Sequence, residues 1–340
     1  MGTVWTRAAG AVAVVGVLAV VVWSGRAELG AVGPTLRGSD PRWLGVLGVL
    51  LAGWLVAWWA VHVTSLGAQR RVHAVDLPVL ARASLAAVAL NSAVKSGGAA
   101  GLVALQRAGR RRSIPDADVR TGYLLATTAV DVGFLLVLAA AMTGLVVDDG
   151  ATRAELAATG AFLLVTVARA GLLVAAARSR VTVGRVLAGG ERLRALVLRR
   201  PRRPVAESSV TDLVTAARAL SARPLRALPA VLAATAVDLL AVGMLVAAVA
   251  AVGGGTHPAL ALVAYVLSAV AATLGPLPGG LGAAELGAVG ALVAGGLPVA
   301  TATAATLLFR VAEFWVPLLV GGVAWTTWRM PARRVQEVAA

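Results

Sequence analysis

The sequence predicts an all-α protein: a polytopic bundle of transmembrane helices, built as an inverted repeat with two re-entrant helical hairpins. The first observation is composition, since 59% of the 340 residues are apolar and only 14% are charged. An average soluble protein is about 25% charged. The second observation is a series of long apolar runs, and the third is a pair of apolar stretches that glycines interrupt. A lipid bilayer is the natural solvent for such a chain.

The apolar runs are long enough to cross a bilayer, which takes roughly 20 residues in a helix. They do not alternate polar and apolar residues as barrel strands do, so helices are the spanning form that the pattern favours. The predicted spans cover about 8–25, 43–66, 120–147, 154–177, 227–252 and 299–328. The first run resembles a secretory signal peptide, but it is longer than usual for that class and we expect it to remain as a helix.

Positive charge is concentrated in a few segments. Of the 31 basic residues, 24 lie at the N-terminus, at 70–82, 107–120 and 178–226, and in the C-terminal tail. This is the asymmetry of the positive-inside rule, which sets membrane orientation. We therefore expect a multi-pass protein of the bacterial inner membrane with both termini in the cytoplasm. The net charge of +15 is explained without a nucleic-acid partner, and none is predicted.

The orientation of the spans predicts two halves, 1–150 and 151–330, within one transmembrane domain of residues 1–340, with 178–226 as a basic cytoplasmic loop. In each half, two helices precede a glycine-broken stretch and a third helix follows it. The stretches, 78–105 and 259–297, are predicted to enter and leave on the same side, the first inside and the second outside. Such interrupted segments mark the substrate site in inverted-repeat transporters. The alternative is that each stretch forms an ordinary span or two short ones.

The predicted hairpin tips are rich in glycine, which permits tight turns and close backbone approach. The first tip contains Gly97 and Gly98. The second contains Pro278, Gly279, Gly280 and Gly282.

Several ionisable residues lie inside apolar segments, where each costs about 2.5–3.5 kcal/mol on insertion scales. Such residues usually face a bundle interior and are candidates for contact with substrate. They are Lys95, Asp131, Arg169, Asp238, Glu285, Arg310 and Glu313, and Asn91 is added as a polar candidate. Arg310 and Glu313 are three residues apart, so they share a helical face, and a local ion pair is one interpretation of the couple.

The sequence does not predict an enzyme. It has no cysteine, no phosphate-binding loop of the Walker type and no nucleotide-binding glycine motif after a strand. The three histidines lack metal-ligand spacing, and His62, which lies within a span, has no obvious partner. We expect no metal and no cofactor.

The second half carries two ordered motifs. Pro278, Gly279, Gly280, Gly282 and Glu285 form one, and Arg310, Phe314, Trp315, Pro317 and Gly321 form the other. In this order and spacing they resemble the closing motifs of the lysylphosphatidylglycerol synthase/flippase transmembrane family. In the first half, Asn91, Gly97, Gly98 and Asp131 resemble a weaker pattern of the same family, with Ser92 where the family commonly has proline and Thr127-Thr128 where it has a Glu-Arg pair.

The resemblance covers essentially the whole chain and implies translocation of a lipid headgroup through a cavity between the repeats. Larger family members append a cytoplasmic aminoacyl-transfer domain, which we do not expect here. The implied partners are membrane lipids, either an anionic phospholipid or a lipid-linked substrate, and a homo-oligomer is left open. Two alternatives are an accessory protein of a lipid-modification or polyprenyl-phosphate pathway and a proton-coupled transporter of a small solute.

Overall fold

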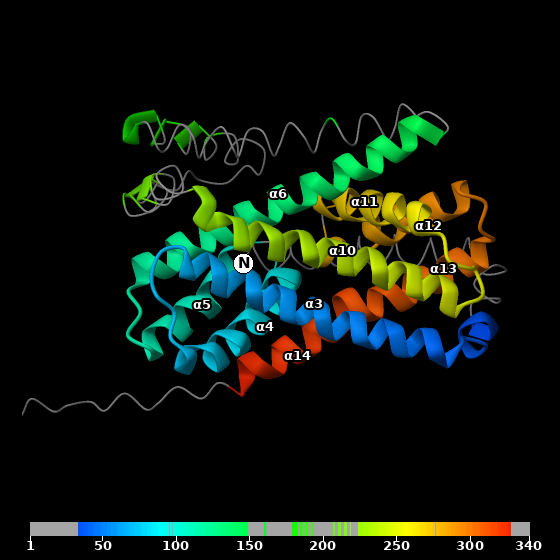
Figure 1. Ribbon diagram of the computed structural model, residues 1–340, viewed down its shortest axis with the longest axis horizontal. Helices are drawn as coiled ribbons and strands as arrows, with labels where there is room; N and C mark the ends of the chain where they lie inside the picture. The colour runs from blue at the N-terminus through cyan, green and yellow to red at the C-terminus, as the bar shows by residue number, and fades with distance from the viewer. Residues whose placement is uncertain are drawn as a thin grey trace, which may run out of the picture. The chain divides into compact units, whose positions relative to one another are not determined.

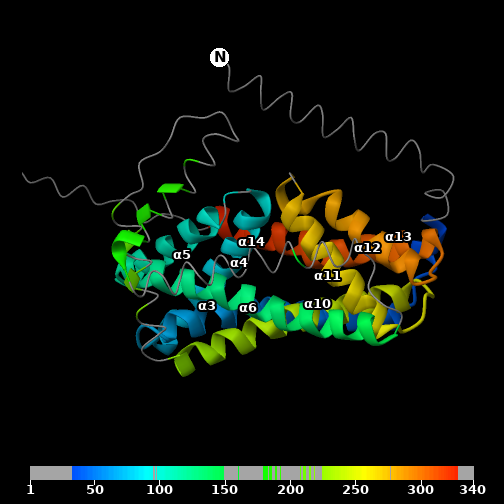
Figure 2. The same ribbon diagram turned by 90° about the horizontal axis from the view of Figure 1, so that it is seen from above.

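The computed structural model describes residues 33–148 apart from Lys95 and Gly97, scattered positions between 160 and 218, and residues 224–327 apart from Pro276. Within these residues all regular structure is helical (Figures 1 and 2). The helices of the first part are α3 (Pro41–Gly67), η1 (Ala74–Asp76), α4 (Leu77–Ala93), α5 (Ala99–Arg111) and α6 (Asp116–Asp148). Those of the second part are η2 (Pro224–Ala227), α10 (Leu228–Ala251), α11 (Pro258–Leu274), η3 (Pro278–Gly280), α12 (Ala283–Ala294), α13 (Val299–Arg310), the π-helical turn η4 (Val311–Trp315) and α14 (Val316–Thr326).

Five helical segments in the described part of the chain are long and apolar enough to cross a membrane. Four of them confirm predicted spans: Pro41–Gly67, Asp116–Thr143, Leu225–Ala251 and Val299–Thr326. The predicted span at 8–25 lies outside the described residues, as does nearly all of 154–177. The protein is therefore built of several apolar helices, as a multi-pass membrane protein requires.

The fifth segment, Ala74–Ala93, joins η1 to α4. It contains much of the first stretch for which the sequence predicted a hairpin that does not cross fully. Its length of 20 residues reaches the roughly 20 that a crossing helix needs. A segment of this length is what the alternative of an ordinary span requires, and it arises because the turn at Ala74–Asp76 extends α4 at its start.

Both glycine-broken stretches are interrupted helices. The first is divided between α4, which ends at Ala93, and α5, which begins at Ala99. The second is divided between α11, which ends at Leu274, and α12, which begins at Ala283. In each stretch the two helices pack against each other, as Figure 1 shows for α11 and α12. Neither stretch is one continuous helix.

The chain divides into two compact units whose boundaries fall inside long helices. Unit 1 comprises Met1–Trp54, Gly133–Thr166 and Thr235–Glu313, and unit 2 comprises Leu55–Val132, Val167–Ala234 and Phe314–Ala340. Each unit thus draws segments from both halves of the sequence. The division into repeats at 1–150 and 151–330 concerns orientation in the membrane and stays a prediction.

Unit 1 contains the α11–α12 pair, and α12 also packs on α13. Small residues bring these helices close together, as is common between membrane helices. A Cβ at Gly287 of α12 would lie 2.8 Å from the carbonyl oxygen of Leu267 in α11. In the same unit the first part of α3 approaches α10, where Gly53 faces Leu240.

Unit 2 contains α4 packed between α5 and α14. At Gly321 of α14 a Cβ would collide with the backbone carbonyl of Leu85 in α4, so only glycine allows this approach. The far end of α14 is held by Arg82, whose Nε donates to the carbonyl oxygen of Ala324 at 3.2 Å. Basic side chains at a helix C-terminus complement the helix dipole.

Candidate functional site

The guanidinium of Arg310 is the centre of a charged cluster in unit 1. Its Nε donates to Glu285 Oε1 at 2.7 Å, its Nη1 to Glu313 Oε2 at 2.8 Å, and its Nη2 to the carbonyl oxygen of Gly279 at 2.8 Å. The Arg310 side chain is only 5% exposed. A buried charge of this kind requires paired and hydrogen-bonded surroundings, and the cluster supplies them. The local pair of Arg310 with Glu313, one interpretation of their spacing, is present.

The local fold around Glu313 explains how two residues of one helix face the same point. Arg310 ends α13 and Glu313 lies in the π-helical turn before α14. Pro317, in the first turn of α14, has no N–H to donate to the carbonyl of Glu313 four residues earlier. Loss of that bond is a physical reason for the wider turn, and π-turns of this kind are frequent at functional sites.

The same cluster anchors the turn between α11 and α12. Arg310 holds the carbonyl of Gly279, and the backbone N–H of Gly282 donates to Glu285 Oε2 at 2.7 Å. Glu285 lies in the first turn of α12, where a carboxylate satisfies a free N–H group and complements the helix dipole. The backbone of this turn needs glycine, because φ is +62°, +66° and +81° at Gly279, Gly280 and Gly282. Pro278 opens the turn η3 and is exposed.

The formal charge of the cluster is −1, from one guanidinium and two carboxylates. The side chains of Glu285 and Glu313 are 24% and 27% exposed, against 5% for Arg310. The side chains of Glu285 and Glu313 are therefore more accessible than that of Arg310, and the guanidinium is the part that holds the cluster together. Such a surface suits a cationic group better than a phosphate.

Asp238 of α10 lies within electrostatic range of Glu313 in the same unit. The hydroxyl of Tyr265 in α11 donates to Asp238 Oδ1 at 2.5 Å. The second oxygen, Oδ2, is buried and has no hydrogen-bond partner among the described residues. Tyr265 in turn meets the rings of Phe134 and Phe309 edge to face. Asp238 is thus a buried carboxyl group of which one oxygen accepts a hydrogen bond and the other accepts none among the described residues.

The turn between α4 and α5 in unit 2 is anchored by neutral groups. Asn91 Oδ1 accepts from the backbone N–H of Gly101 at 2.8 Å, and its Nδ2 donates to the Tyr123 hydroxyl at 2.9 Å. That hydroxyl donates to the carbonyl oxygen of Gly98 at 2.7 Å. Gly98 has a φ of +92°. In both helix pairs, then, a side chain from another helix holds the carbonyl of a turn glycine.

His62 has the partner that the sequence analysis did not find. Its Nδ1 lies 2.7 Å from Ser84 Oγ and 2.9 Å from the carbonyl oxygen of Trp58. The ring stacks with Trp58 and Tyr123. Ser84 is 1% exposed, so this pair holds α3 against α4 inside unit 2.

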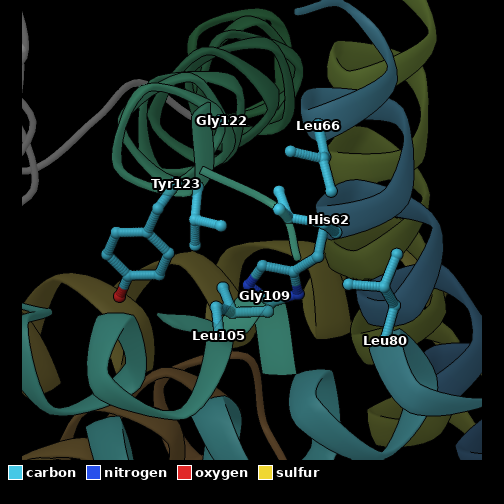
Figure 3. Close-up of a pocket in the computed structure, with 9 residues that line it drawn as sticks. His62, Leu66, Leu80, Leu105, Gly109, Gly122 and Tyr123 are labelled. Carbon is cyan, nitrogen blue, oxygen red and sulfur yellow. The ribbon is translucent and has the colours of Figure 1, made fainter. Parts of the chain in front are cut away.

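A small cavity adjoins His62. Figure 3 shows residues that line it: His62 and Leu66 from α3, Leu80 from α4, Leu105 and Gly109 from α5, and Gly122 and Tyr123 from α6. Its volume is about 20 Å³, which is space for roughly one water molecule. The cavity is therefore too small to hold a lipid headgroup.

The structure brings together part of the predicted set. Glu285, Arg310 and Glu313 are in contact in unit 1 with the turn at Gly279 and Gly282. Asn91 belongs to the turn of Gly98 in unit 2, and Asp131 lies partly buried on α6 in that unit. Lys95, Gly97 and Arg169 lie outside the described residues.

Sequence reasoning missed Tyr123 and Tyr265. The chain has only two tyrosines, and the hydroxyl of each bonds to a predicted site residue. A rare hydroxyl inside an apolar helix was the available signal, because a buried tyrosine O–H usually has a partner.

A search of curated proteins finds no match to this chain. The family model described as the lysylphosphatidylglycerol synthase TM region matches residues 8–321. This range includes both motifs of the second half, together with every predicted site residue. The chain belongs to the family of the lysylphosphatidylglycerol synthase transmembrane region.

Proposed function

We propose that this protein is a flippase-like transporter that moves the headgroup of a phospholipid or lipid-linked molecule across the bacterial inner membrane while the acyl chains stay in the bilayer. Its partners are then membrane lipids, and both termini lie in the cytoplasm. Family membership and the apolar helices support a membrane protein of this kind. We propose a transporter without enzymatic activity or a cofactor.

The observation that carries the proposal is the charged cluster at the turn between α11 and α12. Non-helical backbone at membrane depth is tolerated where it is buried in protein or lines a polar cavity. Here the carbonyl of Gly279 and the N–H of Gly282 are bonded by Arg310 and Glu285. Turns between paired half-helices form substrate sites in transporters with repeats. The cluster holds such a turn in one geometry and leaves the side chains of Glu285 and Glu313 partly exposed.

The two broken helix pairs support the inverted repeat as part of this proposal. Each has a glycine with positive φ at its turn, Gly98 in one and Gly279 in the other. Each turn carbonyl accepts a bond from another helix, from Tyr123 or from Arg310. On this reading α4–α5 and α11–α12 are re-entrant hairpins of opposite orientation.

The charge of the cluster suggests which part of the headgroup it contacts. Since Arg310 is buried against two carboxylates, its charge is already balanced. The surplus negative charge lies on Glu285 and Glu313. We therefore assign these carboxylates to a cationic portion of the headgroup, such as an ammonium group, rather than to its phosphate.

The test is a flipping assay with the purified protein in proteoliposomes, using fluorescent lipids that differ only in the headgroup. Lipids with an amine-bearing headgroup should be moved faster than lipids with a neutral one, and Glu313→Gln should abolish the difference. Glu207→Gln is the matched control, because Glu207 is exposed and lies in the basic loop. A protein that folds normally but moves neither lipid would contradict the proposal.

Asp238 favours a second candidate, proton-coupled transport. Its Oδ2 is buried without a hydrogen-bond donor among the described residues, an arrangement suited to a carboxyl that exchanges a proton. Proteoliposomes with an imposed pH gradient test this. Transport that follows the gradient in the wild type and becomes independent of it in Asp238→Asn would support coupling, while equal rates with and without the gradient would exclude it.

A further inference from the structure

An open pocket in unit 2 is surrounded by arginines and plays no part in the cluster of Arg310. Its volume is about 660 Å³, within the range of ligand sites. Its walls come from the end of α3 and the residues after it, and from the start of the η2–α10 helix. Arg70 and Arg71 lie on the first side, and Arg226 and Pro229 on the second.

These two chain segments are adjacent to the ends of two apolar spans. Pro41–Gly67 ends just before Arg70, and Leu225–Ala251 begins at the residue before Arg226. Because both sets of arginines line one pocket, both span ends lie at the same membrane surface. That surface is where lipid phosphates are found.

The described residues supply the pocket with one carboxylate, Asp118, against three arginines. Arg71 and Arg226 are exposed, and neither pairs with a carboxylate among the described residues. Arg70 has one carboxylate contact among the described residues, with its Nη1 3.8 Å from Asp118 Oδ2. The three arginines that line the pocket repel one another electrostatically, and a bound anion would offset this repulsion.

Helix dipoles explain two of these arginines but not the third. Arg70 and Arg71 follow the C-terminus of α3, where positive charge is favourable. Arg226 lies in the first turn of the η2–α10 helix, where the dipole disfavours a cation. An anion bound beside Arg226 would offset this unfavourable placement.

We propose that this pocket binds a phosphate-bearing anion at the membrane surface. Arginine suits this task because its planar fork donates two parallel bonds to a phosphate. The two sources of such an anion are an anionic phospholipid headgroup and a soluble phosphate. None of its lining residues belongs to the cluster of Arg310, so it is a second site, separate from the proposed transport site.

Native mass spectrometry of the delipidated, full-length protein tests the proposal. The probes are phosphatidylglycerol, phosphatidylcholine and inorganic pyrophosphate, each titrated separately. The wild type should retain phosphatidylglycerol over phosphatidylcholine, and Arg71→Gln/Arg226→Gln should weaken that retention by about tenfold or more, since a bond to a charged group contributes about 1.5–3 kcal/mol. Arg71→Lys/Arg226→Lys should restore part of it.

The matched control is Arg37→Gln/Arg42→Gln. These two arginines are also exposed and their removal changes the net charge equally, but they do not line the pocket. Loss of phosphatidylglycerol binding in the pocket variant alone would support a lipid source. Loss of pyrophosphate binding alone would support a soluble source. Equal losses in the two double variants, or none in either, would overturn the proposal, because diffuse surface charge would then account for binding.

Failure of the pocket proposal can be distinguished from failure of the proposed transport function. The pocket variant leaves Arg310, Glu285 and Glu313 unchanged, so lipid flipping tests one site and lipid retention the other.

Discussion

Arg310 Nε donates to Glu285 Oε1 at 2.7 Å and thereby links the end of α13 to the first turn of α12. The two residues are 25 positions apart in the chain. Through the other oxygen of Glu285, the link extends to the backbone N–H of Gly282. One ion pair therefore fixes both a helix contact and a turn of unusual backbone geometry.

Replacing Arg310 by lysine should lower the thermal stability of the detergent-solubilised protein. A lysine keeps the charge, but its single ammonium cannot reach three acceptors in the geometry of the guanidinium, so Glu285, Glu313 or the Gly279 carbonyl loses its donor. Breaking a buried ion pair costs roughly 3–5 kcal/mol. Melting curves against the exposed control Arg42→Lys measure the effect. A variant as stable as the control would show that the cluster does not hold the turn.

Glu285→Gln and Glu313→Gln should differ, although each removes one carboxylate from Arg310. The Glu285 change also weakens the bond to Gly282 N–H at the start of α12, so stability should fall further in this variant. Among the described residues, Glu313 bonds to Arg310 but not to the backbone of the turn, so its loss should act mainly on lipid flipping. Parallel measurements of melting temperature and flipping rate separate the two, and identical behaviour would contradict the division of roles.

Tyr123→Phe should destabilise the turn between α4 and α5. Removing the hydroxyl leaves the Gly98 carbonyl and the Asn91 amide without the bonds at 2.7 and 2.9 Å. An unsatisfied buried polar group costs about 1–3 kcal/mol. Hydrogen exchange of the amides around 98–101 should rise selectively, and unchanged exchange there would argue against this anchor.

Gly321→Ala should destabilise the packing of α14 on α4, whereas Gly322→Ala should not. A Cβ at Gly321 collides with the carbonyl of Leu85, but at Gly322 it meets nothing within 4 Å. Overpacking typically costs about 1–3 kcal/mol. The two alanine variants have the same composition, so their difference in melting temperature isolates the contact. Equal melting temperatures would mean that α14 can move away from α4 without a loss of folding free energy.

Membrane orientation can be measured with single cysteines because the native chain has none. A cysteine at Ser208, in the basic loop, should react only after the membrane is permeabilised. One at Thr256, which is exposed between α10 and α11, should react from outside in intact cells. External labelling at Ser208 would reverse the predicted topology.

The spans and the broken stretches were predictable because the bilayer imposes them locally. A helix that crosses lipid needs a continuous apolar run of fixed length, and such runs can be read without knowing what packs on them. The interruption between Leu274 and Ala283 was equally visible, since consecutive glycines and prolines disfavour a helix. The turn at Ala74–Asp76 has only three residues, too few to give a periodic signal.

The pairing of the polar groups required the tertiary structure, except where partners share one helix. Arg310 and Glu313 are three residues apart, so helical periodicity alone placed them together. The bonds from Arg310 to Glu285, from Tyr265 to Asp238 and from Tyr123 to Gly98 join different helices. Sequence periodicity defines the face of each helix, but the rotation and depth at which two helices meet depend on how all their side chains pack.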